Sequence, residues 1–152
     1  MAYYHLKNDY IQMPERQKFI DTVRETAAQG YYATLLHELM HWTGNSTRCD
    51  RSYPEKSSYE AYAFEELVAE LGAAFLCGDL GVLNVPRDWA EVNDVSNPPQ
   101  GQEYGQLQNH AAYLHSWIKA LKEKDHPERM LAAAASLAEK AIDHLEGLQP
   151  KK

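Results

Sequence analysis

Two histidines stand four residues apart in this chain, and a glutamate directly follows the first: His37, Glu38 and His41. On a helix, a four-residue step puts His37 and His41 on one face, one turn apart, where two imidazoles can bind one tetrahedral zinc ion. Glu38 then lies beside the metal, poorly placed as a third ligand but well placed to take a proton from a metal-bound water. We therefore interpret the stretch 35–44 as part of a hydrolytic zinc site.

The surrounding pattern predicts that this motif lies on a helix. Thr26 and Gln29 have the spacing of a capping box, and Gly44 suits the end of the helix. Between them, apolar positions recur at helical spacing: Tyr32, Leu35, Leu36, Leu39, Met40 and Thr43. With 7 histidines in 152 residues, a chance match to His-Glu-x-x-His has a probability on the order of a few per cent. The zinc interpretation therefore depends largely on the predicted helix around the motif.

A catalytic zinc usually has three protein ligands and a water, so a third ligand must be found. A second helix is predicted from a capping-box pattern at Ser57 and Glu60 to Gly78 or Gly81, after a polar loop over 45–56. The loop is long enough to bring this helix back antiparallel to the first. It carries three candidate carboxylates, Glu65, Glu66 and Glu70.

Glu66 is our predicted third ligand. Glu66 and Glu70 share a helix face, whereas Glu65 points about 100° away, and we expect Glu65 to lie on a solvated face. The order Glu66-Leu67-Val68-Ala69-Glu70 is similar in form to thermolysin-like zinc peptidases, in which an acidic residue one turn after the ligand orients a ligand histidine. Glu70 would then accept a hydrogen bond from the non-metal nitrogen of His37 or His41. The alternative is that all three form a solvated acidic face.

The rest of the chain predicts an α+β, mainly α fold. Residues 2–13 favour a β-hairpin, and residues 14–23 are compatible with a turn or two of helix. Residues 85–104 form a long connection of the kind that often serves as a lid or rim. Two further helices are expected over 107–121 and from Pro127 to Leu145. We expect one domain over 1–148, followed by a loose tail over 149–152.

Composition excludes several classes of protein. The chain is 44% apolar and 11% aromatic, which allows a real core and excludes a disordered or fibrous protein. Its net charge is −7 without a basic run, so we expect no nucleic acid binding by this domain alone. No apolar run approaches the roughly 20 residues of a membrane span, and the N-terminus does not resemble a signal peptide. We expect a soluble, cytoplasmic protein without a membrane partner.

Several other residues have weaker chemical interpretations. His110 lies on the apolar face of the third expected helix and could stabilise an oxyanion as a catalytic residue, or be a buried structural histidine. Tyr31 and Tyr32 could donate to the same oxyanion, although packing is the simpler role. Cys49 could reach the metal, but a lone thiol is usually unrelated to metal. We expect no disulfide between Cys49 and Cys77, and surface or capping roles for His5, His126 and His144.

Three segments together resemble a known family: residues 31–44, residues 62–70 and residues 109–117. They closely resemble the zincin-like metallopeptidase domain at the C-terminal end of ArdC-type antirestriction proteins of plasmids, phages and bacterial chromosomes. The resemblance extends from Tyr4 to Leu145. In that family the domain usually follows an N-terminal single-stranded-DNA-binding domain, which is absent from these 152 residues, so an excised fragment and a natural stand-alone version both stay open.

The resemblance implies zinc held by His37, His41 and a glutamate of the second helix, with Glu38 as general base. It also implies an antirestriction role for the multidomain proteins, without showing that peptide hydrolysis is how they act. Our leading hypothesis is a zinc-dependent peptidase that acts on a peptide or protein, with residues 3–13 aligning an extended substrate as an added strand. The rival is a zinc-stabilised protein-binding module without proteolytic activity. An empty, degenerate zincin is disfavoured because the motif is intact, and the oligomeric state stays open.

Overall fold

The computed structural model describes residues 1–22, 25–51, 59–82 and 126–150, and the structural statements below concern these residues. In order along the chain, the elements are β1 (Tyr3–His5), β2 (Tyr10–Gln12), a 3-10 helix (Arg16–Lys18), α1 (Ala27–Thr43), α2 (Tyr59–Asp79) and α5 (Pro127–Gly147). The predicted α+β, mainly helical fold class is confirmed. No helix within the described ranges has the length and apolar character needed to cross a membrane.

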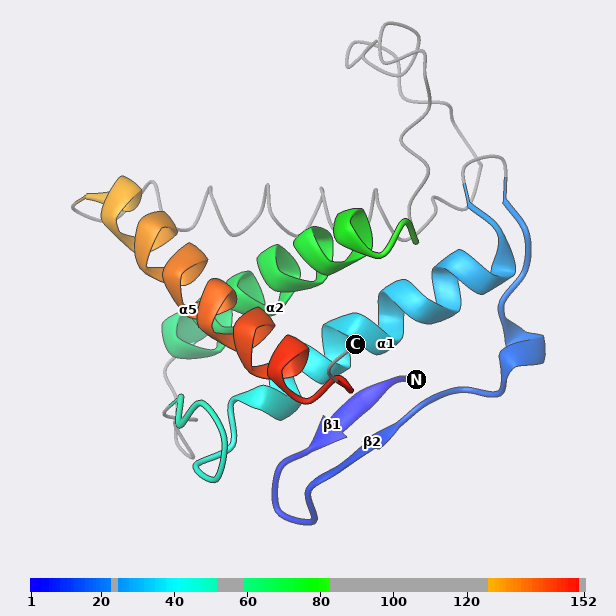
Figure 1. Ribbon diagram of the computed structural model, residues 1–152, viewed down its shortest axis with the longest axis horizontal. Helices are drawn as coiled ribbons and strands as arrows, with labels where there is room; N and C mark the ends of the chain where they lie inside the picture. The colour runs from blue at the N-terminus through cyan, green and yellow to red at the C-terminus, as the bar shows by residue number, and fades with distance from the viewer. Residues whose placement is uncertain (23–24, 52–58, 83–125, 151–152) are drawn as a thin grey trace, which may run out of the picture.

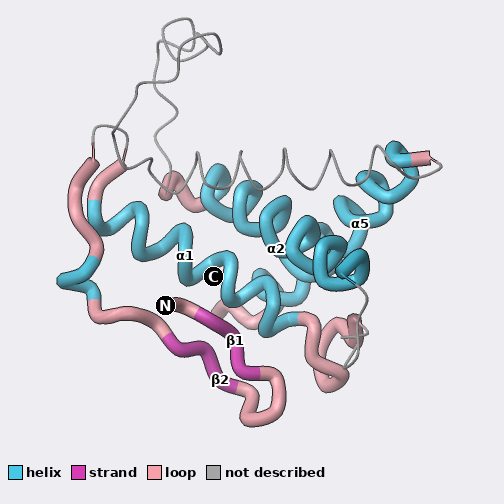
Figure 2. Tube along the Cα trace, turned by 180° about the vertical axis from the view of Figure 1, so that it is seen from behind, coloured by secondary structure: helices cyan, strands magenta, loops and turns pink. Residues whose placement is uncertain are grey.

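The expected hairpin forms over the first 12 residues and lies along α1 (Figure 1 and Figure 2). Its strands are antiparallel, with Tyr4 opposite Ile11 at the centre. Asp9 in the turn has a φ of 52°, a left-handed conformation that aspartate tolerates better than most residues. Its carboxylate accepts hydrogen bonds from Arg48 and from the Tyr4 hydroxyl, which fasten the turn to the loop after α1.

Helix α1 begins and ends at the signals that predicted it. The Thr26 hydroxyl accepts a hydrogen bond from the Gln29 backbone N–H at 3.2 Å, and the Gln29 side chain accepts from the Thr26 N–H at 2.8 Å. This capping box satisfies donors that the first turn of a helix otherwise leaves unpaired. At the other end, the Gly44 N–H donates to the His41 carbonyl. The motif therefore lies on the last turns of a well-defined helix.

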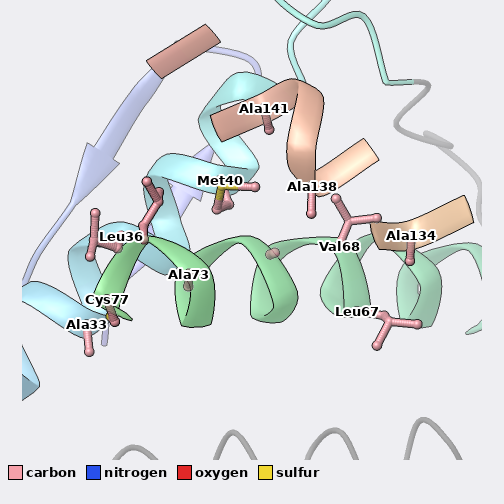
Figure 3. Close-up of a cluster of buried hydrophobic side chains, with 12 residues drawn as sticks. Ala33, Leu36, Met40, Leu67, Val68, Ala73, Cys77, Ala134, Ala138 and Ala141 are labelled. Carbon is pink, nitrogen blue, oxygen red and sulfur yellow. The ribbon is translucent and has the colours of Figure 1, made fainter. Parts of the chain in front are cut away.

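Helices α1 and α2 run in opposite directions, and α5 packs on both (Figure 1). The side chains between them form the buried core (Figure 3): Ala33, Leu36, Met40, Leu67, Val68, Ala69, Ala73, Leu76, Cys77, Ala134, Ala138 and Ala141. Where Met40 packs against α2, position 72 is glycine, and a Cβ there would lie 2.0 Å from Met40 Cε. The Met40 side chain fills the space that this glycine leaves on α2.

Other predicted elements are confirmed in part or lie outside the described residues. Pro127 occupies the first turn of α5, as expected. The segment 14–23 contains only the short 3-10 helix Arg16–Lys18 among its described residues. Ser57, the long connection over 85–104 and the helix expected over 107–121 lie outside the described residues.

Candidate metal centre

The two histidines of the motif lie one turn apart on α1, with their rings turned toward one another. Their Nε2 atoms are 3.1 Å apart, and both side chains are mostly buried, with 15% and 12% of their surface exposed for His37 and His41. This is the arrangement that the four-residue spacing predicts for two ligands of one ion.

Helix α2 brings Glu66 to the same point. One Glu66 oxygen lies 3.6 Å from His37 Nε2, and the other lies 3.5 Å from His41 Nε2. One donor atom from each of the three side chains lies within 4.8 Å of the other two. Among the described residues, these three side chains form a group that could hold a metal ion. The structure thus brings Glu66, rather than Glu65 or Glu70, into contact with both Nε2 atoms.

These separations fit the size of a bound divalent cation. In a tetrahedral zinc site with ligand distances of about 2.0–2.2 Å, neighbouring ligand atoms are about 3.3–3.6 Å apart. The observed separations of 3.1, 3.5 and 3.6 Å lie within or close to that range. Two imidazoles and one carboxylate are also a donor set of catalytic zinc sites. The residues present therefore fit a zinc-sized ion.

Two further glutamates face the outer nitrogens of the histidine rings. Glu70 Oε1 lies 3.4 Å from His37 Nδ1, and Glu65 Oε1 lies 3.3 Å from His41 Nδ1. A carboxylate on Nδ1 fixes the tautomer and orientation of a ligand histidine, leaving Nε2 for the metal. Glu70, the predicted partner of one of the two histidines, thus lies beside His37.

The expectation that Glu65 lies on a solvated face is wrong. Its side chain is 13% exposed and accepts two hydrogen bonds from Arg51, from Nε to Oε2 at 3.0 Å and from Nη2 to Oε1 at 2.8 Å. Glu65 does point away from Glu66 around α2, as expected. The loop after α1, however, folds Arg51 back over that side of α2 and covers the carboxylate.

The local charges keep the two glutamates near His41 ionised. Burial raises the pKa of Glu65, but hydrogen bonds from His41 and Arg51 outweigh it, and the net pKa is lowered. For Glu66, burial is likewise outweighed by His37, His41 and a hydrogen bond from Tyr62, and its pKa is also lowered. Anionic carboxylates are what a cation site requires.

Glu38 has a different environment. It is 7% exposed, and its carboxylate accepts a hydrogen bond from the backbone N–H of Tyr4 in β1. Burial raises the pKa of Glu38, with His37 and His41 opposing the rise. A buried carboxyl group with a raised pKa is suited to accept and return a proton. The hairpin therefore helps to hold the predicted general base.

Other predicted candidates lie elsewhere. Tyr31 packs edge-on against Phe19, and the hydroxyl of the exposed Tyr32 accepts a hydrogen bond from Arg16. The Cys49 thiol faces the Lys140 carbonyl of α5 at 3.8 Å. His110 lies outside the described residues.

His5, His126 and His144 have their described contacts away from the three candidate ligands. The His5 ring stacks on Tyr10, and exposed His126 precedes α5 and contacts Glu128. The His144 ring lies 6.2 Å from that of Trp42, between centroids.

Sequence reasoning missed two residues that contact the site. Arg51 carries no local signal, because it reaches Glu65 only through the folding of the loop after α1. Tyr62, whose side chain hydrogen-bonds to Glu66, is four residues before it on α2. Helical spacing would have found that pair.

Comparison with known proteins gives a consistent family. The sequence profile of a family described as a zincin-like metallopeptidase matches residues 1–94. Two proteins of Escherichia coli named DNA primase TraC are 38% and 37% identical over 99% of this chain. An uncharacterized protein of Sinorhizobium fredii, y4eC, is 34% identical over 97% of it.

Solved structures of the antirestriction protein ArdC from plasmid R388 are also similar. The Mn(II)-bound structure has a TM-score of 0.65 and 39% identity over 97% of this chain, and the metal-free structure has a TM-score of 0.61 and 37% identity over 96%. All these proteins are longer. The chain spans 8% and 11% of the two TraC proteins, 39% of y4eC and 44% and 42% of the two ArdC chains.

Proposed function

The chain belongs to the zincin-like metallopeptidase family, and from this membership we propose that it is a zinc-dependent peptidase that hydrolyses a peptide or protein substrate. The observation that supports the proposal most is the convergence of three donors, from His37, His41 and Glu66, beside a buried Glu38. A zinc site that only stabilises the fold does not need a proton acceptor at that position.

His37, His41 and Glu66 would hold the ion. When bound, zinc supplies a Lewis acid that acidifies a water molecule and polarises a substrate carbonyl. Glu38 would take a proton from the attacking water and later return it to the leaving amine. The Tyr4 N–H holds the Glu38 carboxylate in place, and Glu65 and Glu70 hold the two histidine rings.

The proposal includes the setting and the partner of the reaction. The relatives with informative names are a primase and a plasmid antirestriction protein, which supports a mobile-element context for this chain. An extended peptide is the proposed substrate, and β1, whose central residue contacts Glu38, is the proposed strand along which it aligns. The proposed reaction is inferred from the zincin site of this chain and not from the roles of its longer relatives.

Replacement of Glu38 by Gln tests the proposal. E38Q removes the proton acceptor and leaves the three ligands, so we expect one zinc per chain and at least 100-fold slower cleavage of unfolded casein. Glu128→Gln is the matched control, because Glu128 is exposed on α5 and its loss should change neither property. Metal content is measured by mass spectrometry of the purified proteins and cleavage by release of labelled peptides.

Two results would overturn the proposal. Equal cleavage by E38Q and the unaltered chain would exclude Glu38 as the base. A zinc-loaded chain that cleaves neither casein nor other unfolded proteins would instead support the zinc-stabilised binding module.

A further inference from the structure

Arg51 is a charged residue in the interior of the molecule, and the proposed reaction does not use it. It lies in the loop after α1 and is only 7% exposed. Buried guanidinium groups require partners for their donors, and Arg51 has them on three sides. It donates to the Met40 carbonyl, to the Thr43 hydroxyl at 2.8 Å and to both oxygens of Glu65.

These contacts connect the end of α1 to α2. Met40 and Thr43 lie on either side of His41 in α1, and Glu65 lies next to Glu66 in α2. The two bonds to Glu65 form a fork, with Nε on one oxygen and Nη2 on the other. A planar guanidinium fixes both the position and the rotation of a carboxylate in this way, which the single ammonium of a lysine does not.

The position of Glu65 determines which nitrogen of His41 carries the proton. An ionised carboxylate has only acceptors, so the contact of 3.3 Å between Glu65 Oε1 and His41 Nδ1 requires the proton to be on Nδ1. Nε2 is then the nitrogen that can offer a lone pair to a metal ion, and it is the atom that faces His37 and Glu66.

We propose that Arg51 is a positioning residue of the metal centre: its fork holds Glu65 against His41 Nδ1, and this fixes His41 with Nε2 available to the metal. The proposal rests on the metal centre proposed above. It assigns to a loop residue outside the motif a role in metal affinity, exerted through Glu65.

Arg48 provides a matched control in the same loop. It too donates to the end of α1, from Nε to the Trp42 carbonyl, and its guanidinium lies 3.8 Å from the centre of the Trp42 ring. Its other donors go to Asp9 and the Tyr4 hydroxyl on the hairpin, and Nη1 also donates to the hydroxyl of the neighbouring Thr47. Arg48 therefore fastens the loop without contacting Glu65 or His41 through any bond described for it.

The first measurement uses the metal-free protein, so that it does not depend on zinc binding. Nitrogen-15 NMR of the imidazole rings distinguishes the two neutral tautomers of each histidine. We expect the Nδ1–H tautomer for His41 in the unaltered chain and in Arg48→Lys. In Arg51→Lys and in Glu65→Gln, we expect a mixture of tautomers.

The second measurement is zinc affinity, determined by competition with a chelator. Loss of an outer partner of a ligand histidine typically weakens metal binding by about 10–100-fold, which we expect for R51K and E65Q. The R51K/E65Q double variant should lose no more zinc affinity than whichever single variant binds zinc more weakly. Both substitutions break the same chain of contacts, from Arg51 through Glu65 to His41. R48K should lower the thermal midpoint of the metal-free protein and leave zinc affinity within about twofold.

The outcomes separate this inference from the metal centre itself. Unchanged His41 tautomer and zinc affinity in folded R51K would overturn the role of Arg51, as would equal losses of affinity in R48K. Should R51K fail to fold, E65Q carries the test, since it leaves the Arg51 contacts with α1 intact. An unaltered chain that binds no zinc would overturn the metal centre, while the tautomer measurement would still decide whether Arg51 positions His41.

Discussion

At the scale of single residues, the three glutamates of α2 differ in role because of their angles around the helix. On an ideal helix Glu66 lies about 100° from Glu65 and about 40° from Glu70, so it lies between them. Each histidine turns Nε2 toward Glu66 and Nδ1 outward, where it meets one of the flanking glutamates. Three acidic side chains are therefore needed to hold and orient two imidazoles.

Asp9 gives a residue-scale prediction that depends on pH. Hydrogen bonds from Arg48 and Tyr4 lower the pKa of Asp9 below its ordinary value of 3.8. A carboxylate whose pKa is lowered by folding stabilises the folded state above its unfolded pKa, and this contribution disappears as pH falls through the folded pKa. Asp9→Asn should therefore lower the free energy of unfolding at pH 7, and the difference should vanish in acid below the folded pKa.

Urea titrations of D9N and the unaltered chain at a series of pH values check this prediction. Asparagine tolerates the left-handed backbone at position 9, so backbone strain does not complicate the comparison. When Arg48→Met removes the partner from both proteins, the effect of D9N on the free energy of unfolding should lose most of its pH dependence. A difference that persists unchanged in acid would show that the charge of Asp9 is not its cause.

At the scale of elements, the site depends on how closely α1 approaches α2, and Met40 packs against Gly72 where the two helices meet. A Cβ at position 72 would lie 2.0 Å from Met40 Cε and 2.6 Å from its Sδ, and Met40 immediately precedes His41. Gly72→Ala should lower the free energy of unfolding by about 1–3 kcal/mol, the usual effect of overpacking a core. It should also weaken zinc binding, because it moves the histidines away from Glu66.

Gly78→Ala on the same helix is the control for this prediction. A Cβ at position 78 meets nothing within 4 Å, so alanine there should be neutral or stabilise the helix by up to about 1 kcal/mol. Denaturant unfolding and zinc affinity of the two variants check the comparison. Equal behaviour of G72A and G78A would contradict the role given to the Met40–Gly72 contact.

Elements with local signals were predicted well, and contacts between distant segments were not. The capping box at Thr26 and Gln29 lies within four residues and correctly predicted the start of α1. The spacing of His37 and His41 likewise fixed the geometry of the ligand pair. Arg51 and Glu65 are 14 residues apart, and only the folded loop after α1 brings them together. The periodicity of a sequence does not indicate such a contact, so the sequence alone predicts a solvated Glu65.

At the scale of the whole molecule, the metal centre joins two of the helices that form the core. His37 and His41 come from α1 and Glu66 from α2, and the same helices pack through Met40 and Gly72 a short way along. A metal that binds only the folded chain stabilises it by mass action, by about 2.7 kcal/mol at 100 times its dissociation constant. Metal binding should therefore raise the free energy of unfolding of the whole chain.

Differential scanning calorimetry checks this expectation. Addition of zinc to the metal-free chain should raise the thermal midpoint by several degrees, by an amount that grows with the logarithm of free zinc. Glu66→Gln should reduce the shift, because it removes the contribution of α2 to the centre. A midpoint that does not respond to zinc in the unaltered chain would contradict a metal bound between α1 and α2.

The most direct test of the central claim is an anomalous diffraction map at the zinc absorption edge, recorded from crystals of the zinc-loaded chain. We predict one strong peak at about 2.0–2.2 Å from His37 Nε2, His41 Nε2 and a Glu66 oxygen, with Glu65 and Glu70 remaining on the Nδ1 atoms. The absence of a peak between these three side chains, or a metal ligated by Glu65 or Glu70 in place of Glu66, would contradict it.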